Sequence, residues 1–222
     1  MLAGEAVAAI WNDIAPEGRD QFYDWHINEH IPERVGIPGF RRGRRYIAVD
    51  ARTWPEFFTL YEADTMQVLQ GSDYTNRLND PTPWTTATTA HFRNTTRALA
   101  RLLDSHGPGV GGVMLTIRFD CDDQHVAAIR PLIGDAGQGA RVVGAHLCRG
   151  DTAASTLRSA ESRDRTDIQA PQNCFIMIEV TDTDALRNIL PDLALSNAGV
   201  RGQLVRGVYR LEYSRTKTRF TP

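Results

Sequence analysis

Lysine is almost absent from this chain of 222 residues, in which Lys217 is the single lysine among 25 basic residues. The net charge is only −2, and the arginines are spread over both halves. The sequence therefore lacks the basic surface that binding to nucleic acid or to an anionic membrane requires. No apolar run approaches the roughly 20 residues of a membrane span, and the first residues lack the basic start of a signal peptide. We expect a cytoplasmic protein without nucleic-acid or membrane partners.

Paired cysteines are lacking as well. The three cysteines, Cys121, Cys148 and Cys174, are odd in number and lie far apart in the sequence. No two of them form a C-x-x-C pair, so neither a disulfide framework nor a thiolate zinc site is indicated. We expect three buried free thiols.

A glycine-rich break, SHGPGVGG at 105–112, divides the chain into two halves with the same predicted order of elements. In residues 1–106 we predict strands at 6–12, 44–50, 56–63 and 86–94, and helices at 16–35 and 65–77. In residues 107–222 we predict strands at 112–120, 140–149, 173–180 and 203–213, and helices at 122–133 and 183–193. Each half follows the order β-α-β-β-α-β, which is the ferredoxin-like plan.

A ferredoxin-like sheet carries helices on one face only, and its bare apolar face must be covered. We therefore predict an α+β fold of two tandem repeats whose antiparallel sheets pair face to face around a central cavity. The segment 150–170 shows no apolar period and is predicted to be an insertion that can act as a lid. The fused pair could also form a homodimer.

The stretch DWHINEHIPER at 24–34 contains the densest set of ionisable side chains. Its H-x-x-E-H spacing matches that of inverted zinc proteases, but zinc would need a further ligand, and Pro32 should kink the helix near Ile31. The alternative is an acid/base site, because a histidine with a pKa near 6.5 can exchange protons at working pH. A purely structural histidine that locks the helix to the sheet is also open. At helical spacing, Ile27 and Ile31 fall in an apolar stripe that faces the sheet.

Residues 22–48 resemble the signature of the dimeric α/β-barrel superfamily, in which W-x-x-E-H-x-P-E-R is followed by P-G-F and a strand with R-R-Y. The pattern is most similar to EthD-like proteins and to an uncharacterised bacterial group with E-H-x-P-E-R. The matching residues are Trp25, Glu29, His30, Pro32, Glu33, Arg34, Pro38, Gly39, Phe40, Arg44, Arg45 and Tyr46.

The resemblance implies an intramolecular dimeric α/β barrel and a small-molecule site in the first repeat. The superfamily includes muconolactone-type isomerases, polyketide cyclases, small monooxygenases and haem-handling enzymes, and many members use a histidine and no cofactor. We therefore expect a cofactor-independent enzyme that acts by proton transfer, as an isomerase, cyclase, lyase or cofactor-free oxygenase. Its substrate would be a small organic molecule, aromatic or lactone-like.

Two further hypotheses remain open. The cavity could hold a hydrophobic ligand in a non-catalytic binding or accessory protein, or the protein could use haem or flavin, for which the sequence shows no dedicated motif.

The expected catalytic residues are His30 as the acid/base, with Glu29 and His26 as its supports. Arg44, Arg45 and Tyr46 are expected to hold a substrate oxyanion or hydroxyl, although cations in RRGRR could equally form surface ion pairs. Strand aromatics could line the barrel interior or simply be core. The remaining substrate-binding candidates are Trp25, Tyr61 and His91.

Overall fold

The strands of the two halves form one closed barrel in the computed structural model, which describes residues 2–218. The first half contributes β1 (Ala6–Ile14), β2 (Phe40–Ala48), β3 (Phe57–Ala63) and β4 (Phe92–His106), in the order β4-β1-β3-β2. The second contributes β5 (Val113–Phe119), β6 (Val142–Gly150), β8 (Cys174–Val180) and β9 (Val205–Thr216), in the matching order β6-β8-β5-β9. Antiparallel pairing of β2 with β9 and of β4 with β6 joins the two sheets along both edges. The predicted α+β fold of two ferredoxin-like repeats is confirmed.

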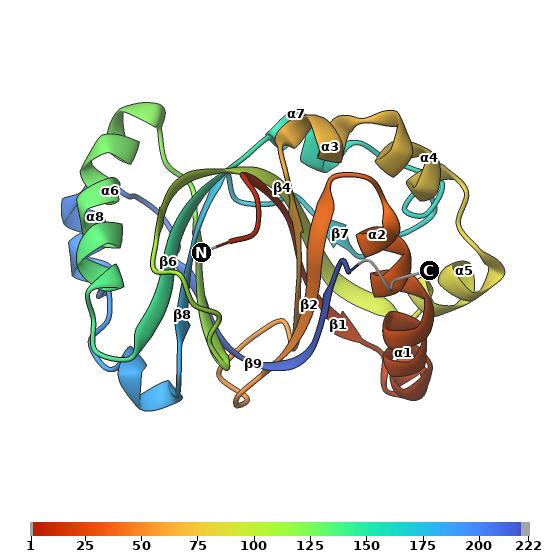
Figure 1. Cartoon of the computed structure of the whole chain (residues 1–222), viewed down its shortest axis with the longest axis horizontal. Coiled ribbons are helices and arrows are strands. Elements are labelled where there is room, and N and C mark those ends of the chain that lie inside the picture. Colours follow the sequence, from red (N-terminus) through yellow and green to blue (C-terminus); the bar gives the residue numbers. More distant parts are fainter. Residues whose placement is uncertain (1, 219–222) are drawn as a thin grey trace.

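The helices lie outside the barrel on two opposite sides (Figure 1). The first repeat carries α1 (Arg19–Trp25), α2 (Ile31–Gly36), α3 (Met66–Gln70), α4 (Ser72–Asn79) and α5 (Pro83–Thr89). The second carries α6 (Asp123–Gly137) and α8 (Asp192–Asn197). Between β6 and β8 the chain forms α7 (Thr152–Thr156) and β7 (Ile168–Gln169), and it crosses to the helical side of the first repeat, where β7 pairs in parallel with β4. Short 3₁₀ turns cover Pro16–Gly18 and Thr183–Leu186.

The predicted strand at 86–94 is wrong. Thr82 caps a helix there by accepting a hydrogen bond from the Thr85 amide, and Pro83 supplies the fixed φ of a first helical residue. The run of threonines suggested a strand because threonine favours strands, but the cap overrides that preference. The last strand of the repeat therefore starts at Phe92 and continues to His106, into the segment predicted to be a linker.

The predicted central cavity is instead a packed core. Trp11 stacks on Phe58 with ring centroids 5.0 Å apart and meets the edge of Phe175 at 5.4 Å. The rings of Tyr46 and Tyr209 also pack on Phe58, at centroid distances of 5.5 and 5.6 Å. Alternation along the strands places these bulky side chains inside the barrel, so of the two interpretations of the strand aromatics, Tyr46 and Trp11 fit that of core residues.

An ion cluster is buried within this core. The Arg44 guanidinium lies 2.9 Å from Glu62 and 2.9 Å from Glu179, and all three side chains are at most 1% exposed. Glu179 also accepts a hydrogen bond from the Gly111 amide and faces His146 at 3.6 Å. Burial alone would raise the pKa of Glu179, but His146 and the Arg44 charge lower it to about 2. Arg44 thus ties the two repeats together through one carboxylate from each.

Candidate functional site

The H-x-x-E-H stretch forms a single π-helical turn, His26–His30, between α1 and α2. The Ile31 amide donates to the His26 carbonyl, and Pro32 has no amide to donate. The predicted kink at Ile31 is thus a π turn in a nearly continuous helix, a feature often found at functional sites. The extra residue in the turn changes which side chains face the sheet: Ile31 is fully buried, whereas Ile27, expected in the same stripe, is 37% exposed.

The π turn places both histidines against one tryptophan. The Trp25 ring is parallel to His26 at a centroid distance of 5.2 Å and lies 4.1 Å from His30. The two imidazoles are 5.7 Å apart, and both are buried. The helix therefore presents two imidazoles side by side on an aromatic platform.

Both histidines line a cavity of about 280 Å³ between the outer face of the first sheet and its helices. This volume is near the lower limit of small-molecule sites. The floor includes Ile10, Asn12, Thr59 and Tyr61 from β1 and β3, and the roof comes from the segment 155–171 of the second repeat. The cavity is therefore built by both repeats, although its histidines come from the first.

Four buried polar atoms of the lining have no hydrogen-bond partner. They are Nδ1 of His26, Nδ1 of His30, Oγ1 of Thr59 and the hydroxyl of Tyr61. A buried polar group without a partner costs about 1–3 kcal/mol, and native structures contain few of them. Their convergence on one cavity indicates a place for a molecule with complementary polar groups.

Burial also sets the protonation of these groups. Desolvation lowers the pKa of both imidazoles well below the usual histidine value, and the charges of Arg45 at His26 and of Arg34 at His30 lower it further. Desolvation raises the pKa of Tyr61 well above its usual value. At neutral pH the cavity therefore holds two neutral imidazoles, which can accept a proton, and a phenol that can donate a hydrogen bond.

Acidification from about pH 7 to about pH 5 is expected to destabilise the fold through His26 and His30. The unfolded histidines titrate near 6.5, whereas the folded ones do so well below that value. The unfolded chain thus binds more protons in this range, and stability is complete above about pH 6.5 and falls below it, by at most about 1.4 kcal/mol per pH unit for each histidine. Urea unfolding at several pH values measures this slope. Asn substitution of either histidine should reduce it, and an unchanged slope in both variants would contradict the assignment.

Glu29 supports the platform without touching an imidazole. Its carboxylate accepts hydrogen bonds from the hydroxyls of Thr82 at 2.6 Å and Thr85 at 3.1 Å. Thr85 in turn accepts a hydrogen bond of 3.0 Å from the Trp25 indole. The carboxylate thereby fixes α5 to the π turn and orients the ring on which both histidines lie.

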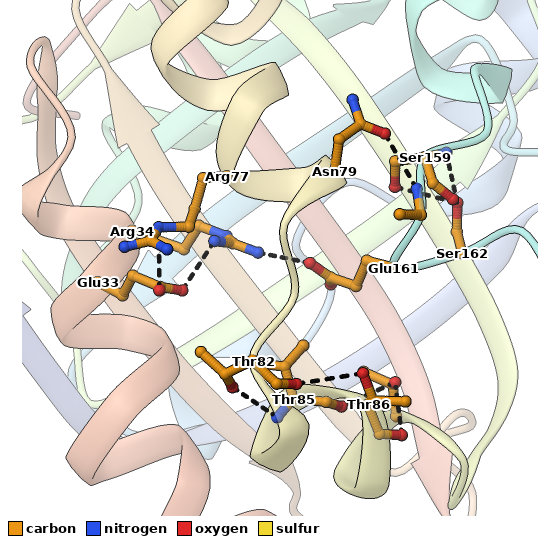
Figure 2. Close-up of polar contacts among 12 residues, drawn as sticks. Glu33, Arg34, Arg77, Asn79, Thr82, Thr85, Thr86, Ser159, Glu161 and Ser162 are labelled. Atoms are coloured by element: carbon orange, nitrogen blue, oxygen red, sulfur yellow. Dashed lines mark hydrogen bonds and ion pairs between the residues drawn. The ribbon is translucent and has the colours of Figure 1, made fainter.

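The roof is held down by an ion pair that spans the repeats. Figure 2 shows the Arg34 guanidinium joined to Glu33 and to Glu161, at 3.0 and 2.5 Å, and Arg77 also pairs with Glu33, at 3.0 Å. A further contact joins the roof to the first repeat, because the Ala160 amide donates to the Asn79 side chain at 3.0 Å. Arg34 is only 2% exposed, so the ion pair is shielded from solvent.

A second group of polar contacts attaches the other end of the roof segment to β4. Arg165 pairs with Asp167 at 2.7 Å, and both side chains hydrogen-bond the Thr95 hydroxyl on β4. The Arg165 guanidinium also covers the Phe92 ring at 4.9 Å. The segment predicted to be a lid thus lies over the cavity, attached on two sides.

The predicted site residues divide into two groups. In the first group, His26, His30, Trp25 and Tyr61 all line the cavity. Glu29 does not line it but accepts a hydrogen bond from Thr85, the residue that contacts the Trp25 indole.

The other four lie elsewhere. Arg44 and Tyr46 point into the barrel core, on the opposite face of β2. Arg45 lies over the Tyr23 ring at 4.5 Å and pairs with Glu212. His91 is in the turn before β4, with its ring against Gly18. None of the four lines the cavity. Strand alternation directs Arg44 and Tyr46 into the core, Arg45 lies on the helix side of β2 but over Tyr23, and the helix at Pro83–Thr89 leaves His91 in the turn that follows it.

Sequence reasoning did not single out several cavity residues. Asn12 and Thr59 are polar side chains on outward-facing positions of β1 and β3, where apolar neighbours pack on helices. Their place in the period-2 pattern was a usable signal. Arg97 lies on β4 and was not singled out. The roof residues lacked any such pattern, because the segment 155–171 has almost no regular structure.

The three cysteines are free and buried, as predicted. Across residues 2–218, no three His, Cys, Asp or Glu side chains lie close enough together to hold a metal ion. No helix in this described range is long and apolar enough to span a membrane.

No protein-family model and no curated protein matches the sequence. Solved structures match over nearly the whole chain. An anthrone oxidase-like protein shares 12% identity at a TM-score of 0.61, with 95% of this chain and 92% of that chain covered. A predicted monooxygenase from Fusobacterium nucleatum subsp. nucleatum gives 7% and 0.56, with 97% and 96% covered. One from Lactobacillus acidophilus gives 10% and 0.56, with 96% of each covered. Together with the closed eight-stranded arrangement, these similarities show that the chain has the dimeric α/β-barrel fold.

Proposed function

We propose that this protein is a cofactor-independent enzyme that transfers a proton on a small aromatic or lactone-like molecule bound in the cavity beneath the roof segment. The observation that carries the proposal is the group of four unpaired polar atoms on His26, His30, Thr59 and Tyr61 around that cavity. A bound molecule with oxygen atoms would satisfy them, whereas a purely apolar ligand would leave them unpaired.

His30 is the proposed base, with His26 beside it. A neutral imidazole has one nitrogen with a free lone pair, and the depressed pKa keeps both rings in that state. When His30 takes a proton from an acidic carbon or hydroxyl of the substrate, the imidazolium lies next to the anion that it has produced. Tyr61, whose raised pKa keeps its proton in place, donates a hydrogen bond to the substrate oxygen.

The charges around the cavity favour an anionic intermediate. Arg34, Arg97, Arg158 and Arg165 line it, against the single carboxylate Glu161. Arg97 and Arg158 donate to backbone carbonyls of the roof, which leaves their charge without a carboxylate partner in these contacts. Positive charge near a developing enolate or phenolate stabilises it in a water-poor site.

The same cavity could serve a non-catalytic binding protein, which remains the alternative. The two attachments of the roof favour retention of a ligand, because the Arg34–Glu161 ion pair and the hydrogen bonds of Arg165 and Asp167 to Thr95 must all break before the roof lifts. The two functions differ in one respect: only the enzyme accelerates proton exchange on the molecule that it binds.

Deuterium exchange distinguishes them. Wild-type protein is mixed in D₂O with anthrone-type aromatic ketones and with butenolide lactones, and exchange at the acidic carbon is followed by NMR against buffer alone. We expect exchange above the buffer rate, with saturation at high ketone or lactone concentration. Saturable binding without faster exchange would establish the binding protein instead. Failure of both classes to bind would refute the proposed substrate chemistry.

A further inference from the structure

Two of the three buried cysteines form a pair that the sequence spacing does not suggest. Cys121, just past the end of β5, and Cys174, the first residue of β8, lie 53 positions apart, yet their sulfurs are 3.0 Å from each other. Cys148 instead lies in the barrel core, which is on the other face of the sheet. The pair belongs to the second repeat and is separate from the cavity described above.

The backbone around the pair is clamped by Asn173. Its side-chain oxygen accepts from the Cys121 amide at 2.9 Å, and its side-chain nitrogen donates to the Cys121 carbonyl at 3.2 Å. Its own amide donates to Asp120 at 2.8 Å. These hydrogen bonds join the loop after β5 to the residue before Cys174, so the short distance between the sulfurs is imposed by both chain segments.

An arginine guanidinium lies next to the two sulfurs. Arg149, on β6, places Nη1 3.3 Å from the Cys174 sulfur and 3.5 Å from the Cys121 sulfur, and it also donates to the Cys121 carbonyl. Its side chain is 23% exposed and pairs with Asp123 at the start of α6. The guanidinium thus connects the buried pair with the surface and favours a thiolate beside it.

The two sulfurs differ in acidity. The hydrogen bond from Cys121, followed by Arg149, lowers the pKa of Cys174 even though burial opposes it. The same contact with Cys174 raises the pKa of Cys121, as does burial. Burial raises the pKa of Cys148, which has no such partner. Cys174 is therefore the sulfur that first becomes a thiolate, and Cys121 holds the proton.

We propose that Cys121 and Cys174 form a redox-active dithiol that a hydroperoxide converts reversibly to a disulfide. The Cys174 thiolate attacks the terminal peroxide oxygen, the O–O bond breaks, and the alkoxide or hydroxide leaves with a proton as alcohol or water. The Cys121 sulfur then attacks the resulting sulfenic acid, and the hydroxyl leaves as water. Two thiols and one peroxide thus give one disulfide, one alcohol or water, and one further water.

The geometry requires little movement. A disulfide is about 2.05 Å long, so the sulfurs must approach by about 1 Å from their present 3.0 Å. Side-chain rotation can supply such a shift without rearranging the strands. In a reducing cytoplasm a bond of this kind would be transient, as redox-sensing disulfides are.

The test treats purified, reduced protein with one equivalent of hydrogen peroxide, denatures it in iodoacetamide and measures the intact mass. We expect one alkylated thiol, against three in the untreated protein, and a peptide that links Cys121 to Cys174 and disappears with dithiothreitol. Alkylation of all three thiols after peroxide, or a bond that involves Cys148 or a second chain, would overturn the proposal.

Variants separate the pair from nonspecific oxidation. Cys148→Ser is the matched control and should form the same bond at the same rate. Cys121→Ser and Cys174→Ser should form none, and Arg149→Gln should slow oxidation at neutral pH and recover part of the rate at higher pH, where the thiolate forms without the cation. If Arg149→Gln forms the disulfide at the wild-type rate at every pH, the guanidinium plays no part in the oxidation and the role proposed for Arg149 is wrong. Circular dichroism confirms that each variant is folded.

Discussion

An asparagine at position 30 is expected to lower the rate of substrate proton exchange by about 10²–10⁴-fold, the usual contribution of a positioned acid/base group. Asparagine fits the space and offers hydrogen bonds but cannot take up a proton. Nδ1 of His30 has no partner in the fold, so the main structural loss is packing against Trp25 at 4.1 Å. The measurement is the exchange assay together with the thermal midpoint, which should change little.

His106→Asn is the matched control, because that histidine is 38% exposed and pairs with Asp104 away from the cavity. It should exchange substrate at the wild-type rate. His26→Asn reports whether the neighbouring imidazole substitutes for His30: if both single variants remain active and the double variant is inactive, either ring can act as the base. A His30→Asn protein that retains full activity but loses much of its stability would show a structural histidine instead.

The second large effect concerns stability. Arg44→Met is expected to destabilise the fold by about 3–5 kcal/mol, the cost of removing one partner from a buried ion pair. Without Arg44, Glu179 loses one of the groups that hold its pKa at about 2, and Glu62 keeps only Arg42 as a cationic partner. Urea unfolding of wild type and variant measures the difference.

Two further variants show whether the loss of stability comes from the buried charges. Arg41→Met removes the exposed ion pair with Asp64, which should be worth at most about 1 kcal/mol. Adding Glu62→Gln and Glu179→Gln to Arg44→Met removes the stranded charges and should recover part of the loss. If the triple variant is no more stable than Arg44→Met alone, the loss reflects packing around the arginine and not unpaired carboxylates.

The fold could be predicted from the sequence because the order of elements repeats and each strand carries its own apolar pattern. The signature around His30 located the helix that lines the cavity, but it did not reveal the face of the sheet on which the cavity lies. Arg44 and Arg45 are neighbours in the sequence and point to opposite sides of β2, so a one-residue step decides between core and helix layer.

Contacts between distant segments could not be predicted. Nothing near Arg34 in the sequence points to Glu161, 127 positions away, and the same holds for the meeting of Cys121 with Cys174. The contact of Arg34 with Glu161 depends on the path of the chain between β6 and β8, which has no periodic pattern to read. The cysteine contact depends on the antiparallel register of β5 and β8, which pairs Phe119 with Cys174. The roles of His30, His26 and Tyr61, and a further association of the chain into a homodimer, stay predictions.

The joining of both repeats in one polypeptide has a consequence for mass action. Where such a barrel is made from two separate chains, dilution below the dissociation constant separates the half that holds the histidines from the half that supplies the roof. Here β2–β9 and β4–β6 pair within a single molecule, and the covalent connection sets a fixed effective concentration of one half for the other. The roof therefore stays available to the cavity when the protein is diluted, and turnover per molecule of the proposed enzyme should be the same at nanomolar as at micromolar protein.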